Sequence, residues 1–197
     1  MFDYELTTGA PMESETRQIA RGLRQGDVVV LEALVEQYQY RIVRYLIYLL
    51  GRRDGVDDLV QEIWLRVLER GASYDGRSRF EPWLFRIARN IAVDALRKRR
   101  TFSLDSHHGD DDNVRPATAS AEPSPFTLAA RTEDAERLAR SLEALEPVYR
   151  EALLLRFQED LSLQEISAIV GAPVSTVASR IYKGLATLRP QFEGESA

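Results

Sequence analysis

Apolar residues recur at intervals of three and four on both sides of residues 101–130, which is the spacing of helices that bury one face. In the N-terminal part, this spacing predicts a long amphipathic helix with Asp27 as its N-cap and Gly51 as its stop. A shorter helix is predicted before it, from about Ser14 to Gln25. The buried face of the long helix is predicted to consist of Leu31, Leu34, Val35, Tyr38, Ile42, Tyr45, Leu46 and Leu49.

Two more helices are predicted before residue 101. One runs from Val56 to Arg70, with Gly71 at its C′ position. The other has Ser78 as its cap and runs to about Arg100, with Pro82 in its first turn. The predicted inward residues are Leu59, Val60, Ile63, Val67 and Leu68 in the first of these helices and Leu84, Ile87, Ala88 and Ile91 in the second.

The C-terminal part contains a capping box, Ser162-Leu163-Gln164-Glu165, which marks the start of a short helix that ends at Gly171. A second helix is predicted from about Val174 to Arg189, and two helices precede the box, from about Thr132 to Ala144 and from Pro147 to Gln158. Two short helices joined by a three-residue turn form a helix-turn-helix. A generic helical hairpin has the same amphipathic pattern, so the segment alone leaves both interpretations open.

The second helix of this pair carries polar residues suited to reading DNA. Its inner face is predicted to consist of Val177, Ile181, Leu185 and Leu188. The opposite face can hydrogen-bond base edges and phosphates in a major groove. That outward face consists of Ser175, Thr176, Ser179, Arg180 and Lys183.

The stretch from 101 to 130 lacks apolar periodicity and contains three prolines and a run of aspartates, which favours a flexible acidic linker between two domains. His107 and His108 lie in it, but adjacent side chains on a flexible segment do not form a preorganised metal site. We therefore predict an all-α protein of two helical domains. The predicted parts are an N-terminal tail at 1–14, a domain at 15–100, the linker, a helix-turn-helix domain at 131–192 and a C-terminal tail at 193–197.

Composition narrows the class of protein. The 197 residues include no cysteine, so disulfides, thiolate metal sites and cysteine nucleophiles are excluded. No apolar run approaches the roughly 20 residues of a membrane helix, and the acidic start from Met1 to Glu5 lacks the basic segment of a signal peptide. We expect a cytoplasmic protein that does not insert into membranes.

Positive charge is concentrated locally despite the formal net charge of −5. Residues 15–100 carry 17 bases and 12 acids, and the segment from Arg77 to Arg100 alone carries eight bases and two acids. Such a segment is typical of a phosphate-binding surface. The alternative is a solvated helix end whose cations complement the helix dipole.

Four blocks in this order resemble the bacterial RNA polymerase sigma factors of the extracytoplasmic-function (ECF) group, within the sigma-70 family. Two lie before the linker, Asp57-Asp58-Leu59-Val60-Gln61-Glu62-Ile63-Trp64-Leu65-Arg66-Val67 and Phe80-Glu81-Pro82-Trp83-Leu84-Phe85-Arg86-Ile87-Ala88-Arg89-Asn90. Two lie after it, Leu161-Ser162-Leu163-Gln164-Glu165-Ile166-Ser167 and Ser175-Thr176-Val177-Ala178-Ser179-Arg180-Ile181. The resemblance implies a sigma2-like domain, a linker and a sigma4-like domain.

The resemblance also implies site residues. The polymerase-binding residues are expected to be Asp57, Asp58, Gln61, Glu62 and Arg66, which could instead be an ordinary solvated face. The −10 promoter element is expected to meet Arg77, Phe80, Arg86, Asn90, Arg97 and Lys98, although the rings of Phe80 and Trp83 could belong to the core. The −35 element is expected to meet the outward residues Ser175, Thr176, Ser179, Arg180 and Lys183. Relatives often carry bases where this chain has Ala178 and Leu185, which predicts weaker phosphate binding here.

The resemblance implies a dissociable polymerase subunit that recognises promoters and promotes strand opening, with no cofactor and no bond chemistry of its own. Its expected partners are core RNA polymerase, through the β′ clamp helices and the β subunit, promoter DNA and an anti-sigma factor. An autonomous helix-turn-helix regulator would explain only the C-terminal half. An enzyme is disfavoured because the paired acids Asp57 and Asp58 have no phosphate loop, metal-ligand spacing or nucleophile beside them.

Overall fold

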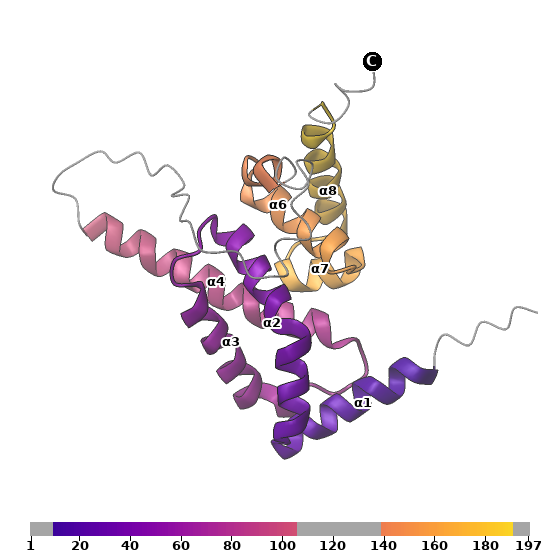
Figure 1. Ribbon diagram of the computed structural model, residues 1–197. Coiled ribbons are helices and arrows are strands. Elements are labelled where there is room, and N and C mark those ends of the chain that lie inside the picture. Colours follow the sequence, from indigo (N-terminus) through magenta and orange to yellow (C-terminus); the bar gives the residue numbers. More distant parts are fainter. Residues whose placement is uncertain (1–9, 106–138, 191–197) are drawn as a thin grey trace, which may run out of the picture.

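The computed structural model describes residues 10–105 and 139–190, and every regular element in those ranges is helical (Figure 1). This confirms the predicted all-α class. Residues 1–9, 106–138 and 191–197 lie outside the described residues. Most of the predicted linker, including His107 and His108, and the first part of the helix predicted from about Thr132 fall in these ranges. In the parts of the chain that are described, no helix combines the length and the apolar character needed to cross a membrane.

The N-terminal half consists of α1 (Ala10–Gln25), α2 (Val28–Leu50), α3 (Val56–Arg70), the short 3-10 turn η1 (Gly71–Ser73) and α4 (Phe80–Asp105). Local signals explain the ends of α2: the Asp27 side chain accepts a hydrogen bond from the Val29 amide, and Gly51 closes the helix at a φ of 65°. Only glycine adopts that left-handed conformation without strain. Both bounds were predicted from these two residues.

An aromatic cluster forms the centre of this half. Phe80 is 2% exposed, and its ring meets the rings of Tyr38 and Tyr74 edge to face at centroid distances of 5.4 and 5.3 Å. Trp83 packs against the same ring at 5.5 Å. Such contacts add to the burial of apolar area, and they anchor the start of α4 between α2 and the loop before it. The predicted stripe of α4, Leu84, Ile87, Ala88 and Ile91, is buried as expected.

Three predictions in this half were wrong in detail. Gly71 has a right-handed φ of −54°, and its missing side chain matters because a Cβ there would lie 3.0 Å from that of Leu23 in α1. α4 begins at Phe80, so Ser78 is not its cap; the Ser78 carbonyl accepts a hydrogen bond from the Tyr74 hydroxyl. Leu68 is 47% exposed, because α3 turns Trp64 inward with Val60 and Val67.

α4 extends to Asp105, five residues beyond its predicted end at Arg100. The sequence from 101 to 105 contains neither glycine nor proline, so nothing local stops the helix there.

The C-terminal half contains a helical turn at 139–143, α6 (Pro147–Leu153), the π-helical segment η2 (Leu154–Gln158), α7 (Leu163–Val170) and α8 (Val174–Leu188). The capping box is present in full: Ser162 accepts from the Glu165 amide, and the Glu165 carboxylate accepts from the Ser162 amide. Gly171 ends α7 in the left-handed region.

α8 differs from the prediction at one position. Val177, Ile181 and Leu188 are buried as expected, but Leu185 is 42% exposed and Gly184 is buried in its place. A Cβ on Gly184 would lie 2.9 Å from the Leu153 side chain. α6 and α8 therefore approach each other over a glycine, and the close approach turns Leu185 outward.

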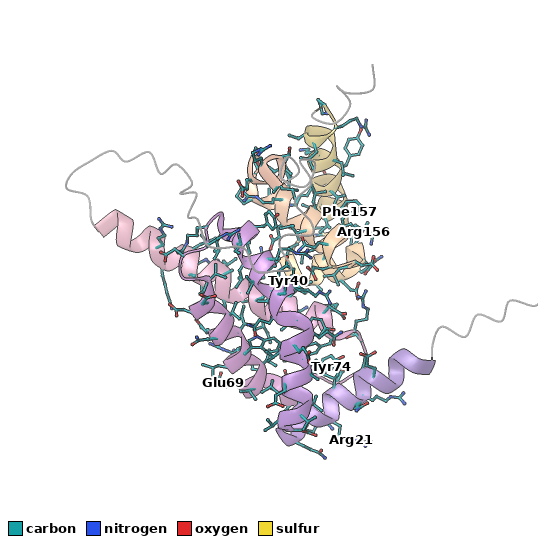
Figure 2. All side chains as sticks on the ribbon, viewed as in Figure 1. Arg21, Tyr40, Glu69, Tyr74, Arg156 and Phe157 are labelled. Atoms are coloured by element: carbon teal, nitrogen blue, oxygen red, sulfur yellow. The ribbon has the colours of Figure 1, made fainter. Side chains whose placement is uncertain are left out.

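The two halves share one continuous core, in which α7 contacts α4 and α6 contacts α2 (Figures 1 and 2). Leu155 and Leu161 of the C-terminal half are fully buried together with Phe85 of α4. Arg150 of α6 also crosses between the halves, donating a hydrogen bond of 2.7 Å to the Tyr48 carbonyl.

Candidate nucleic-acid interface

The outward face of α3 carries the residues predicted to bind polymerase. Asp57, Asp58, Gln61 and Glu62 are exposed, and Arg66 is half-buried beside Glu62, with an ion pair of 3.6 Å. The four exposed residues have no role in the core, which leaves them available to a partner.

Two leucines on the same helix were not predicted as surface residues. Leu65 is 60% exposed and Leu68 is 47% exposed. Exposed leucines on a polar helix face provide apolar contact area for a partner. The available signal for Leu65 was its position one residue after Trp64, outside the stripe that the helix buries.

α4 exposes four of the predicted −10 residues. Arg86, Asn90, Arg97 and Lys98 are exposed. A polar pocket of about 310 Å³ lies between α3 and α4 and includes Asn90 and Arg97. Its other polar lining residues are Glu62, Arg66, Arg70, Arg89 and Asp94. Arg70 and Arg89 were not predicted; Arg70 comes near Asn90 only when α3 packs on α4, whereas Arg89 precedes Asn90 on α4.

Three hydrogen bonds hold the loop before α4, residues 74–79, in place. The Thr16 hydroxyl of α1 donates a hydrogen bond of 2.8 Å to the Gly76 carbonyl. The Arg77 amide donates to the Asp75 carboxylate at 2.9 Å, while the Arg77 side chain remains 89% exposed. At the base of the loop, the Tyr74 hydroxyl donates a hydrogen bond of 2.6 Å to the Ser78 carbonyl. The loop therefore offers an exposed arginine on a fixed support.

Phe80 lies apart from the other predicted −10 residues. With its side chain packed between Tyr38, Tyr74 and Trp83, it has no open face on which a base could stack. Contact with DNA at this position stays a prediction, and it requires the ring to leave the core.

The predicted −35 residues lie on α8. Ser175, Ser179 and Lys183 are exposed, whereas Thr176 and Arg180 are half-buried. The full capping box orients α7, and the buried Val177 and Ile181 fix which side of α8 faces out. A helix held in this way can present its N-terminal polar residues to a major groove.

Two family models match the chain: Sigma-70 region 2 over residues 34–102 and Sigma-70, region 4 over residues 135–188. The ECF RNA polymerase sigma-E factor of Escherichia coli strain K12 is 34% identical over 164 residues, which are 82% of this chain and 85% of that protein. The chain belongs to the ECF sigma factors. Region 2 of this sigma factor spans α3 and α4 with most of α2, and region 4 ends with α8.

Two further RNA polymerase sigma factors match most of the chain. CarQ of Myxococcus xanthus is 31% identical over 84% of this sigma factor and 91% of CarQ. SigW of Bacillus subtilis strain 168 is 27% identical over 92% of this chain and 98% of SigW.

Two solved structures share the fold. RpoE of Bartonella quintana, in complex with the anti-sigma factor NepR, aligns with a TM-score of 0.69 at 23% identity, covering 83% of this sigma factor and 97% of that chain. CnrH, in complex with the cytosolic domain of CnrY, aligns with a TM-score of 0.62 at 23% identity. The alignment covers 92% of this sigma factor and 99% of the CnrH chain.

Proposed function

We propose that this ECF sigma factor binds core RNA polymerase, directs it to promoters with particular −10 and −35 elements, and promotes strand opening. The observation that carries the proposal is the pair of polar surfaces on different halves of the chain, one on α3 and α4 and one on α8. Each surface consists of polar residues that the core does not use. No cofactor enters this function, and the chain performs no bond chemistry in it.

We assign three contacts to the described residues. The acidic face of α3, from Asp57 to Arg66, meets the β′ clamp helices, and Leu65 and Leu68 add apolar contact. Arg77, Arg86, Asn90, Arg97 and Lys98 meet the −10 element. The outward residues of α8 meet the −35 element, while the β subunit also contacts the factor.

We further propose that an anti-sigma factor binds this chain and that the protein acts in the cytoplasm. The RpoE and CnrH structures were solved with NepR and with the cytosolic domain of CnrY, and this chain shares their fold. An apolar groove lined by Leu153, Leu154, Phe157, Leu185 and Leu188 supports the proposal, because the Phe157 ring is 63% exposed there.

The test is run-off transcription by bacterial core polymerase with and without this protein, followed by the paired substitutions Asp58→Ala and Gln61→Ala. We expect the pair to weaken binding to core enzyme and to leave helix content unchanged, because exposed polar residues contribute little to stability. Glu32→Ala with Gln39→Ala is the matched control, since it also removes one acid and one amide from an exposed face, on α2. Equal affinities of the two pairs for core enzyme would refute the α3 assignment.

A further inference from the structure

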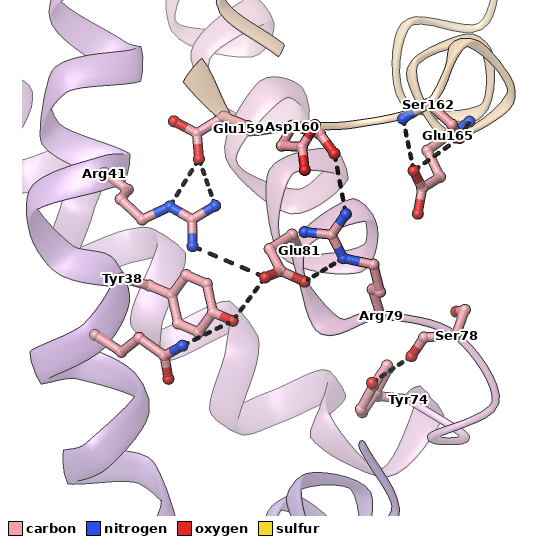
Figure 3. Close-up of polar contacts among 11 residues, drawn as sticks. Tyr38, Arg41, Tyr74, Ser78, Arg79, Glu81, Glu159, Asp160, Ser162 and Glu165 are labelled. Carbon is pink, nitrogen blue, oxygen red and sulfur yellow. Dashed lines mark hydrogen bonds and ion pairs between the residues drawn. The ribbon is translucent and has the colours of Figure 1, made fainter. Parts of the chain in front are cut away.

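Two buried carboxylates lie where the halves of the chain meet. The Glu159 side chain is 0% exposed, and one of its oxygens lies 2.8 Å from both Nε and a terminal nitrogen of Arg41 in α2 (Figure 3). Arg44, one turn further along α2, lies 3.9 Å from the other oxygen. Glu159 therefore faces two arginines that are more than a hundred residues away in the sequence.

Glu151 makes the second such contact. Its side chain is 6% exposed, and one oxygen accepts hydrogen bonds from the Tyr45 hydroxyl at 2.9 Å and from Arg89 Nε at 2.8 Å. Tyr45 belongs to α2 and Arg89 to α4. As with Glu159, the charge of the C-terminal half is balanced by the N-terminal half.

The backbone that carries Glu159 has two unusual features. Residues Leu154–Gln158 form a π-helix, and Asp160 has a φ of 51°, the only positive value among the non-glycine residues that the structure describes. The Arg79 guanidinium donates a hydrogen bond of 3.0 Å to the Asp160 carbonyl (Figure 3). Such conformations persist where the surroundings impose them, and they are common at functional sites.

These contacts suit a junction that opens. A buried carboxylate that loses its arginine within a protein is strongly destabilising, but here separation of the halves returns both charges to water. The junction also buries apolar side chains, among them Phe85, Leu155 and Leu161, which opening exposes. Hydration of the separated charges offsets part of that cost, which a purely apolar junction could not do.

Arg89 connects this junction to the predicted −10 surface. It binds Glu151 on one side and lines the pocket with Asn90 and Arg97 on the other. We propose that Glu151 and Glu159 form an acidic latch that holds α6–α8 on α2 and α4, and that the carboxylates compete there with the phosphates of single-stranded DNA for Arg89, Arg41 and Arg44. Arginine binds both groups through the same planar set of donors. The inference rests on the proposed function, since it assigns a new phosphate site and its regulation to the same factor.

The latch affects the two DNA surfaces differently. Ser175, Ser179 and Lys183 of α8 stay exposed while the latch is closed. Reading of a −35 duplex is therefore independent of the latch, and only binding of the single strand depends on its opening.

The first experiment measures the separation of the halves in the full chain without DNA or polymerase. Because the sequence contains no cysteine, Glu36→Cys in α2 and Ala186→Cys in α8 place spin labels at two exposed positions only. Pulsed electron paramagnetic resonance should give one narrow distance distribution in the parent. Glu151→Gln with Glu159→Gln should broaden and lengthen it, whereas Glu32→Gln with Glu146→Gln, the same charge change at exposed positions, should not.

The second experiment measures the affinity of each variant for a mixed-sequence DNA single strand of about 12 nucleotides. We expect the latch variant to bind about tenfold more tightly than the control pair if the parent is about nine-tenths closed. Affinity for a −35 duplex should be equal in the two variants. Because their net charges are equal, nonspecific attraction cannot produce the difference.

Either of two results would overturn the latch: a parent whose distance distribution is already broad, or a latch variant that matches the control in both distance distribution and single-strand affinity. Glu159→Arg provides a stronger form of the test, because it places a third positive charge against Arg41 and Arg44. If Glu159→Arg keeps the helix content and the narrow distance distribution of the parent, the latch is wrong. The distance measurement stands even if run-off transcription shows that the factor does not activate core polymerase, so the two proposals can fail separately.

Discussion

The two halves of the molecule are stabilised in different ways. α2, α3 and α4 are long helices around an aromatic centre, and α2 is closed by its own cap residues, Asp27 and Gly51. α6, α7 and α8 are shorter, and their core is aliphatic. They also bury Glu151 and Glu159, whose arginines lie in the other half, and expose Phe157 and Tyr182 at 63% and 73%.

The difference indicates an order of dependence. The N-terminal half relies on the C-terminal half for the acceptor of the Tyr45 hydroxyl, whereas the C-terminal half buries two carboxylates that arginines of α2 and α4 neutralise. The smaller half should therefore be the first to loosen, and perturbations in it should leave the larger half intact.

Truncating one buried isoleucine in each half is the strongest way to test this dependence. Ile63 in α3 and Ile166 in α7 are both 0% exposed, and replacing either with Ala should cost about 2 to 5 kcal/mol. Both tryptophans, Trp64 and Trp83, lie in the N-terminal half, so their fluorescence follows that half while far-ultraviolet circular dichroism follows all helices. Ile166→Ala should lower the dichroism midpoint and leave the fluorescence midpoint nearly unchanged. Coincident midpoints in both variants would show a single cooperative unit.

Arg180→Ala tests the division of DNA contacts between the halves. If Arg180 reads a guanine edge, promoter binding should fall by about 1 to 3 kcal/mol, with lost preference at one base pair of the −35 element. Binding assays with a set of single-base-pair substitutions measure both effects. Lys183→Ala should instead weaken binding to all DNA sequences alike. It should also reduce, by about 1, the slope of the logarithm of the binding constant against the logarithm of the salt concentration. An Arg180→Ala variant that keeps the parent's affinity and preference would contradict the assignment.

The capping side chains allow a smaller, matched comparison. Ser162→Ala at α7 and Asp27→Ala at α2 each remove one side-chain acceptor for a helix amide, and each should cost about 1 kcal/mol. Urea unfolding followed by the two probes should place the Ser162 effect in dichroism alone and the Asp27 effect in both signals. A Ser162 effect of equal size on tryptophan fluorescence would argue against separate units.

Alkaline pH should lower the stability of the N-terminal half, which should not change near neutral pH. Burial and nearby acids raise the pKa of Tyr74 to about 12 and also raise the pKa of Tyr38 and Tyr45. Because the folded pKa exceeds that of an unfolded tyrosine, about 10, the stability from these phenols is complete below pH 10 and is lost as pH rises above it. Thermal unfolding between pH 9 and 12, followed by tryptophan fluorescence, should show the loss. Tyr74→Phe should reduce the slope, and an unchanged slope would mean that ionisation of this phenol does not cause the loss.

The sequence predicted what local interactions determine. The caps at Asp27 and Ser162 and the stops at Gly51 and Gly171 act within one helical turn, so the bounds of α2 and α7 followed from them. The same reasoning wrongly assigned Gly71 to a C′ position. Gly71 instead leaves space for Leu23 of α1, which packs against its backbone.

Interactions between distant parts of the chain were beyond prediction. Leu185 was assigned to the inner face by its spacing, but the approach of Leu153 over Gly184 rotates it outward. The pairing of Glu151 with Arg89 joins residues 62 positions apart and leaves no periodic pattern. The order of the sequence blocks identified the family of the candidate site, whereas the pocket beside Asn90 emerged only from packing of α3 on α4.

The π-helical turn at Leu154–Gln158 has a consequence for the evolution of this segment. A π turn is an α turn that has absorbed one extra residue in a single widened turn, so the helix before it and the chain after it keep nearly the directions they would have without the extra residue. The widened turn lies directly before Glu159, which contacts Arg41 in the other half. A homologue that is one residue shorter here can therefore have an ordinary α turn and still place its next carboxylate near the same arginines.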